Sequence, residues 1–156
     1  TGNCIIFNAG IVKSNSLNAF MFTNCSLPMD NLQDTEKFST LINHIPGVIY
    51  RCTGDEWLSL EFFSDGIEKL TGYPLDYFAQ NRKDGYSKIV YEEDRELLKK
   101  KIREAVAGKK KFEIEYRIVK KNGEICWVLE RGQGVYEEAS DVSYVDGCIF
   151  NIHHRK

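Results

Sequence analysis

The sequence lacks two features that would each indicate a well-defined class of function. No apolar run approaches the ~18 residues that a membrane-spanning helix needs. Positive charge is not in excess, because 21 basic residues stand against 23 acidic ones for a net charge of −2. Binding to nucleic acid or to an anionic membrane surface normally requires clustered positive charge. We therefore expect no membrane span and no nucleic-acid partner.

Cysteine and histidine are too scattered to form a metal or catalytic site. The chain has five cysteines but no CxxC pair, and its three histidines lie near no obvious nucleophile. Zinc sites need such spacings, and covalent or acid–base catalysis needs a nucleophile with a base, or paired acids. No phosphate-binding glycine loop is present either. We expect no metal, no catalytic residue and no enzyme activity. An odd number of cysteines within apolar runs favours reduced thiols and a cytoplasmic location.

The charge pattern divides the chain at about residue 30. Residues 1–30 are rich in Asn and Ser and carry only Lys13 and Asp30 as charges, whereas charge density rises sharply afterwards. This pattern predicts an N-terminal extension, 1–30, and a domain, 31–156. Met29 is a candidate natural start. The apolar groups of the extension need burial to offset the entropy lost on ordering, so we expect them on the outer face of a sheet or on a second copy of the chain.

The helical patterns begin with a flanking helix at 31–45. Its apolar residues, Leu32, Phe38, Leu41, Ile42 and Ile45, fall near one face. Short helical pieces follow between residues 64 and 80, with Gly72 as a stop signal. Residues 85–94 form a connector, and a long helix covers 94–107, where Leu98 and Ile102 belong to one buried stripe. The lysine runs 99–101 and 109–111 are predicted to be solvated.

Five segments show strand patterns. They are 48–53, 57–64, 112–119, 124–136 and 143–153. Strict alternation predicts that Leu58, Leu60 and Phe62 share a face. Asn122-Gly123 indicates a type I′ turn between the third and fourth strands. Because strands cluster at both ends of the chain, we predict an α+β fold with one antiparallel sheet. The first two strands must then lie beside the last one, and the helices cover one face with a space beneath the long helix.

Four stretches in this order resemble the PAS sensor domains of bacterial sensor kinases and diguanylate cyclases. They are "FSDGIEKLTGY", "VYEEDRELL", "EYRIVKKNGEICWV" and "GCIFNIHHRK", and the resemblance covers about residues 38–156. It implies the PAS fold, with a core at 46–153 and the start of a linker at 154–156. It also implies a signalling module of a larger protein that senses a small molecule, forms a homodimer and acts on a C-terminal effector domain. The alternative is a ligand-free module that serves mainly in dimerisation.

The resemblance also restricts the cofactors. Haem-binding members carry a histidine on the long helix, but residues 94–107 contain none. Flavin-binding light sensors use an Asn-Cys-Arg run after the second strand, and the only similar stretch, "TNCS" at 23–26, precedes the domain. We therefore expect neither haem nor flavin, and any ligand should be a small organic molecule held without a covalent bond.

Candidate ligand contacts follow from the expected space between helices and sheet. They are Tyr50, Phe62, Leu70, Tyr73, Tyr77, Ile89, Leu98, Ile102, Ile114 and Tyr116. The alternative is that these side chains simply fill the core. Tyr50, Tyr77 and Tyr116 are the preferred contacts, because a buried phenol needs a polar partner.

The last candidate site is the exit from the domain. Where the family has Asp-Ile-Thr, a motif that ties the final strand to the linker, this chain has Asn151, Ile152 and His153. Asn keeps an acceptor oxygen without the charge, and histidine, unlike threonine, can change its charge near neutral pH. The resemblance therefore implies a signal exit at these residues. The alternative is a looser junction with solvated histidines.

Overall fold

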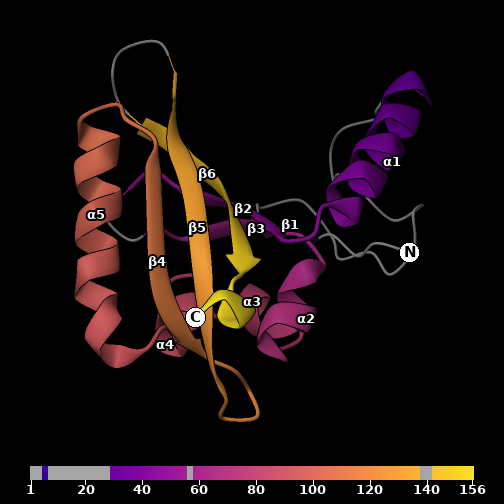
Figure 1. The fold of residues 1–156 in the computed structure, drawn as a ribbon. Helices are drawn as coiled ribbons and strands as arrows, with labels where there is room; N and C mark the ends of the chain where they lie inside the picture. The colour runs from indigo at the N-terminus through magenta and orange to yellow at the C-terminus, as the bar shows by residue number, and fades with distance from the viewer. Residues whose placement is uncertain (1–4, 7–28, 56–57, 138–141) are drawn as a thin grey trace.

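One antiparallel sheet organises the molecule (Figure 1). The structure, a computed structural model, describes residues 5–6, 29–55, 58–137 and 142–156. The strands are β1 (Ile5–Ile6), β2 (Val48–Thr53), β3 (Leu60–Phe63), β4 (Phe112–Val119), β5 (Ile125–Tyr136) and β6 (Val142–Asn151), in the order β1-β3-β2-β6-β5-β4. The five predicted strands are present, and the predicted pairing of the first two beside the last is confirmed by β2 against β6.

Strand β1 was not predicted. Its two residues pair with β3 at the edge of the sheet, with Ile5 opposite Phe63 and Ile6 opposite Phe62. The expectation for the other apolar residues of the extension falls on 7–28, which lie outside the described residues.

The helices are α1 (Met29–His44), α2 (Gly66–Thr71), α3 (Leu75–Gln80), α4 (Gly85–Ile89) and α5 (Arg95–Ala107), with short 3-10 turns η1 (Glu92–Asp94) and η2 (His153–Arg155). The connector predicted at 85–94 thus contains a helix. Helices α2 to α5 bury most of their apolar residues against the sheet, with Leu97 of α5 as an exposed exception. Helix α1 instead projects away from it (Figure 1), and Phe38 and Leu41 are 66% and 65% exposed.

A β-bulge in β3 changes which side chains face the core. Arg51 pairs with Phe62 but Cys52 pairs with Leu60, so Glu61 is the extra residue. Leu60 and Phe63 consequently share the core face, and Phe63 is only 2% exposed. The predicted alternation was therefore wrong at Phe62. Arg82 fixes the bulge, because it donates to the Glu61 carboxylate at 2.9 Å and to the Leu60 carbonyl at 3.0 Å.

The β4–β5 turn differs from the type I′ prediction. Among the turn residues only Gly123 has a positive φ, 89°. Its N–H donates to the Lys120 carbonyl at 2.9 Å, and the Lys120 N–H donates to the Glu124 carbonyl at 2.8 Å. These bonds enclose a three-residue loop with glycine in the left-handed position, which is a common hairpin alternative to type I′.

The face of the sheet beneath the helices is mainly apolar. In β4 the predicted alternation is confirmed, since Phe112, Ile114, Tyr116 and Ile118 are buried while Glu113 and Glu115 are exposed. In β6, Gly147 lies opposite Tyr50. A Cβ atom at Gly147 would be 2.6 Å from the Tyr50 phenol oxygen, so glycine there makes room for the phenol over the sheet.

Candidate functional site

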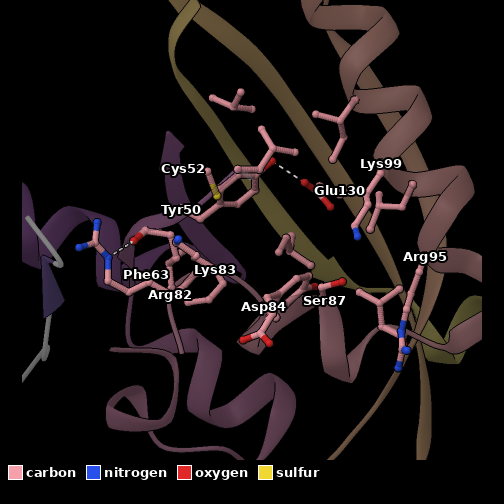
Figure 2. A pocket seen from close by; sticks show the side chains of 18 of the residues that line it. Tyr50, Cys52, Phe63, Arg82, Lys83, Asp84, Ser87, Arg95, Lys99 and Glu130 are labelled. Carbon is pink, nitrogen blue, oxygen red and sulfur yellow. Dashed lines mark hydrogen bonds between the residues drawn. The ribbon is translucent and has the colours of Figure 1, made fainter. Parts of the chain in front are cut away.

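A cavity of about 540 Å³ lies between the sheet and helices α4 and α5 (Figure 2). Its wall is mainly apolar and comes from both layers of the fold. The apolar lining residues are Leu58, Leu60, Phe63, Val90, Leu98, Ile102, Val145 and Ile149. The bulge in β3 contributes directly, because it turns both Leu60 and Phe63 toward the cavity. The predicted space beneath the long helix is therefore present as a cavity.

Three of the ten candidate ligand contacts line this cavity: Tyr50, Leu98 and Ile102. Four others, Leu70, Ile89, Ile114 and Tyr116, are buried in the core outside the lining. Tyr73 and Tyr77 pack on the core edge with their ring centroids 4.6 Å apart, and Phe62 points away because of the bulge. That any of them binds a ligand stays a prediction.

The inner polar group of the cavity is Glu130, which the sequence analysis did not identify. Glu130 lies on β5, is 4% exposed and faces the cavity. The Tyr50 phenol donates to its Oε1 atom, and the Tyr116 phenol donates to its Oε2 atom at 2.6 Å. The Tyr86 hydroxyl lies 2.8 Å from that of Tyr116. Two of the three preferred tyrosines therefore have the same partner, whereas the Tyr77 hydroxyl lies 3.5 Å from the Gly85 carbonyl oxygen.

A signal for Glu130 was present in the sequence. Cys126, Val128 and Glu130 alternate along β5, and all three are buried on one face. Glu130 also pairs directly with Ile114 of β4. An acidic residue at the third position of an otherwise apolar strand face indicates a buried carboxylate, which needs hydrogen-bond partners.

Burial controls the ionisation of this cluster. Loss of solvent raises the pKa of Glu130 above its usual range, and hydrogen bonds from Tyr116 and Tyr50 oppose that rise. Burial, and then the Glu130 charge, raise the pKa of the Tyr50, Tyr86 and Tyr116 phenols. The phenols thus remain protonated donors at neutral pH. Burial likewise raises the pKa of the Cys52 thiol at the cavity wall, so this thiol is not activated as a nucleophile.

The rim of the cavity is basic. Its charged lining residues in the described part of the chain are Arg82, Lys83, Arg95, Lys99 and Arg103, together with Asp84. Arg82 pairs with Glu61, Asp84 pairs with Lys88 at 2.9 Å, and Arg95 donates to the carbonyls of Val90 and Lys88. Lys99 corrects one prediction, because it is half-buried and lines the cavity instead of being fully solvated. Figure 2 shows its side chain reaching from α5 into the cavity.

The exit residues tie the end of β6 to β5. The Asn151 Oδ1 atom accepts from the His153 N–H at 2.9 Å and from the Cys126 thiol at 3.4 Å. The N–H of Ile152, which is 4% exposed, donates to the Trp127 carbonyl at 3.0 Å. His153 itself is exposed. The amide oxygen therefore does bridge strand and exit, while no structural observation assigns His153 a role.

The described residues contain neither a metal-binding cluster nor a membrane-spanning helix. No group of three or more His, Cys, Asp or Glu side chains there is arranged to hold a metal ion. Nor is any helix in that part of the chain both long and apolar enough to cross a membrane.

Comparison with known proteins supports the same fold. A family profile described as the PAS fold matches residues 60–149, which is more than half of the chain. No curated protein sequence matches significantly. Among solved structures, the N-terminal domain of a diguanylate cyclase with PAS/PAC sensor from Marinobacter aquaeolei is 18% identical with a TM-score of 0.61, covering 70% of this chain and 97% of that one.

Two further structures agree. A PAS domain from Colwellia psychrerythraea is 19% identical with a TM-score of 0.65, covering 78% of this chain and 99% of that one. A domain of a putative light and redox sensing histidine kinase from Haloarcula marismortui is 19% identical with a TM-score of 0.59, covering 74% of this chain and 97% of that one. The profile match, the sheet order and the cavity beneath α5 agree, and the chain belongs to the PAS family of signalling domains.

Proposed function

We propose that this PAS domain senses a small organic molecule in the cavity and relays its binding to a C-terminal effector domain of a larger bacterial signalling protein. The effector would be of the histidine kinase or diguanylate cyclase type, and the protein a cytoplasmic homodimer. The cavity is the observation that carries the proposal. Ligand sites are typically apolar cavities of roughly 300–1,000 Å³ with a few convergent polar groups, and this one has about 540 Å³ with Glu130 at its inner end.

The proposed ligand is neither haem nor flavin. Among the described lining residues there is no histidine to ligate iron, and burial keeps the Cys52 thiol protonated and unreactive. A molecule held by shape and hydrogen bonds suits these walls better than a covalently attached chromophore.

A relay route runs along β5. Glu130 contacts the cavity, and Trp127 in the same strand accepts the hydrogen bond from Ile152 at the exit. Cys126, next to Trp127, donates to Asn151. A ligand that shifts β5 would therefore act on both bonds that hold the exit.

A cavity-filling variant tests the proposal. Val145 lines the cavity and is 1% exposed, so Val145→Phe should occupy the space that a ligand needs. Native mass spectrometry of the chain as purified should then show a bound mass with the unchanged protein and none with Val145→Phe. Leu75→Phe enlarges a buried core residue of α3 outside the cavity lining and should retain the bound mass, which separates ligand exclusion from general overpacking.

One observation favours the alternative of a ligand-free dimerisation module. Phe38 and Leu41 of α1, with Ile45 just after the helix, are exposed apolar residues that form a face without a partner in the described chain. If the unchanged protein carries no bound mass, and Phe38→Glu converts a dimer to a monomer in analytical ultracentrifugation, the dimerisation function replaces the sensing function.

A further inference from the structure

The geometry points to an amphoteric ligand, an amino-carboxylic acid with an apolar body, whose ammonium group binds Glu130 and whose carboxylate lies at the basic rim. This inference rests on the proposed sensing function and adds the chemical class of the ligand. It follows from the direction of the hydrogen bonds at Glu130 and from the positive charge of Lys99, which lines the same cavity.

At the inner end, every phenol hydrogen of the cluster is already used. Tyr50 and Tyr116 each donate to one oxygen of Glu130. Since Tyr116 has a single hydroxyl hydrogen, the 2.8 Å contact with Tyr86 requires Tyr86 to donate to Tyr116. The cluster thus has the fixed order Tyr86 to Tyr116 to Glu130, with Tyr50 joining from the other side.

This order leaves only acceptors toward the cavity. An ionised carboxylate has about four acceptor positions, of which the two phenols occupy two. Glu130, Tyr50 and Tyr86 line the cavity, whereas Tyr116 lies behind it. A ligand that meets this cluster must therefore bring the donor itself. A second acceptor, such as a carboxylate, would face Glu130 with no hydrogen between them and would be repelled.

A cationic donor fits this position better than a neutral one. Glu130 is 4% exposed, so its charge has lost most of its hydration. Hydrogen bonds between ionised partners are about twice as strong as neutral ones, and the attraction between opposite charges is stronger away from bulk water. An ammonium group supplies both the donor and the compensating charge.

The rim requires the opposite charge on the same ligand. Lys99 of α5 is half-buried, and its ammonium-bearing side chain lines the cavity. Asp84, the acid at the rim, is paired with Lys88. A ligand with only positive charge would be repelled here, just as one with only negative charge would be repelled at Glu130. Glu130 and Lys99 together select a molecule that carries both charges.

Three probes with the same ring and carbon chain separate the contributions of the two ligand charges to binding. Phenylalanine has both charges, phenethylamine has only the ammonium, and 3-phenylpropionate has only the carboxylate. We expect isothermal titration calorimetry to show phenylalanine binding at least about tenfold more tightly than either. Leucine and tryptophan vary the size of the apolar body at constant charge.

Two variants then assign each ligand charge to its partner in the cavity. Glu130→Gln should weaken the binding of phenylalanine and phenethylamine by about tenfold or more. It should not weaken the binding of 3-phenylpropionate, and should strengthen it, because the variant removes the charge that repels a carboxylate. Lys99→Gln should weaken the binding of phenylalanine and 3-phenylpropionate, and should strengthen the binding of phenethylamine, because it removes a charge that repels the ammonium group. Lys100→Gln is the matched control, because the Lys100 side chain is 71% exposed on the same helix and should leave all three affinities unchanged.

If Glu130→Gln folds poorly, the comparison of probe affinities between Lys99→Gln and the unchanged protein still tests the proposal. Binding of 3-phenylpropionate as tight as that of phenylalanine, with no effect of either variant, would overturn the amphoteric class. A co-purified molecule without an amine would also overturn it while leaving the sensing function intact. Absence of both a co-purified molecule and any probe binding would overturn the two proposals together.

Discussion

Glu130 makes the free energy of unfolding depend on pH in an unusual direction for a carboxylate. Its pKa is raised in the folded state by burial, so the folded protein binds this proton more tightly than the unfolded chain. Its contribution to stability is therefore fully present below the ordinary pKa of 4.5 and is lost as the pH rises through the folded-state value.

Replacing the carboxylate with an amide should remove this dependence. As the pH rises above 4.5, the free energy of unfolding of Glu130→Gln should increase relative to that of the unchanged protein. Rearranging the phenols around the amide also costs free energy, but this cost is the same at every pH. Urea unfolding of both proteins at several pH values measures this difference. Parallel pH profiles would mean that Glu130 ionises in the folded state as it does in the unfolded chain.

At the level of single residues, part of the candidate site could be predicted from the sequence. Tyr50 and Tyr116 were selected because buried phenols need polar partners, and both have one in Glu130. The partner was missed because the strand was assigned by its apolar residues, although the alternation through Cys126 and Val128 reaches Glu130. Lys99 was missed because a lysine run indicates a solvated face, and only packing shows that one member turns inward.

Among the elements, α5 begins at a specific ionic contact with β4. The Arg117 guanidinium donates to the Asp94 carboxylate at 2.6 and 2.9 Å, and the Arg117 backbone N–H adds a third bond at 2.9 Å. Hydrogen bonds from Arg117 hold the pKa of Asp94 below its usual value. These bonds fix the start of the helix that covers the cavity.

Asp94→Asn should lower the free energy of unfolding by about 1 kcal/mol at neutral pH, because solvent partly screens the pair. The lowered pKa means that this stabilisation is present above pH 3.8 and is lost as the pH falls through the folded-state value. The variant and the unchanged protein should therefore converge in acid-denaturation curves. Glu93→Gln is the control, since the Glu93 side chain is 75% exposed and should matter less. Equal effects of the two variants would contradict the role of Asp94.

Helices and strands with a regular spacing of apolar residues could be predicted from the sequence. Features that depend on contacts with residues far along the chain could not. The alternation in β4 and the apolar stripe of α5 are local, so both were found with nearly correct bounds. The bulge at Glu61 depends on Arg82, 21 residues away, and breaks the alternation that local reasoning assumes. Helix α4 has five residues, too few to show a helical period.

For the whole molecule, the exit at Asn151 connects the fold to the proposed effector. Its side-chain oxygen holds both the His153 backbone and the Cys126 thiol, yet the residue is exposed. Asn151→Ala should thus lower the melting temperature by only a few degrees but abolish signal-dependent output of the full-length protein. Output and melting temperature are measured on the same variant.

Asn122→Ala provides the matched control for this prediction. Its Oδ1 atom also accepts a backbone bond, from Glu124 at 3.0 Å, but it lies in the β4–β5 turn rather than at the exit. Output should persist in this variant. Normal signalling by Asn151→Ala would leave the looser junction as the description of the exit.

The central position of β6 also determines when the fold can be completed. Strand β6 joins β2 on one side and β5 on the other, so the two halves of the sheet meet only through the last strand. The β4–β5 hairpin pairs residues that are close in the sequence, whereas the β2–β6 pairing joins Val48 to Ile149. Pairings between residues so far apart in the sequence slow folding. During synthesis, β2 and β5 therefore keep open edges, which favour aggregation. The domain closes only as its exit segment leaves the ribosome, so assembly of the sheet and formation of the exit are one event.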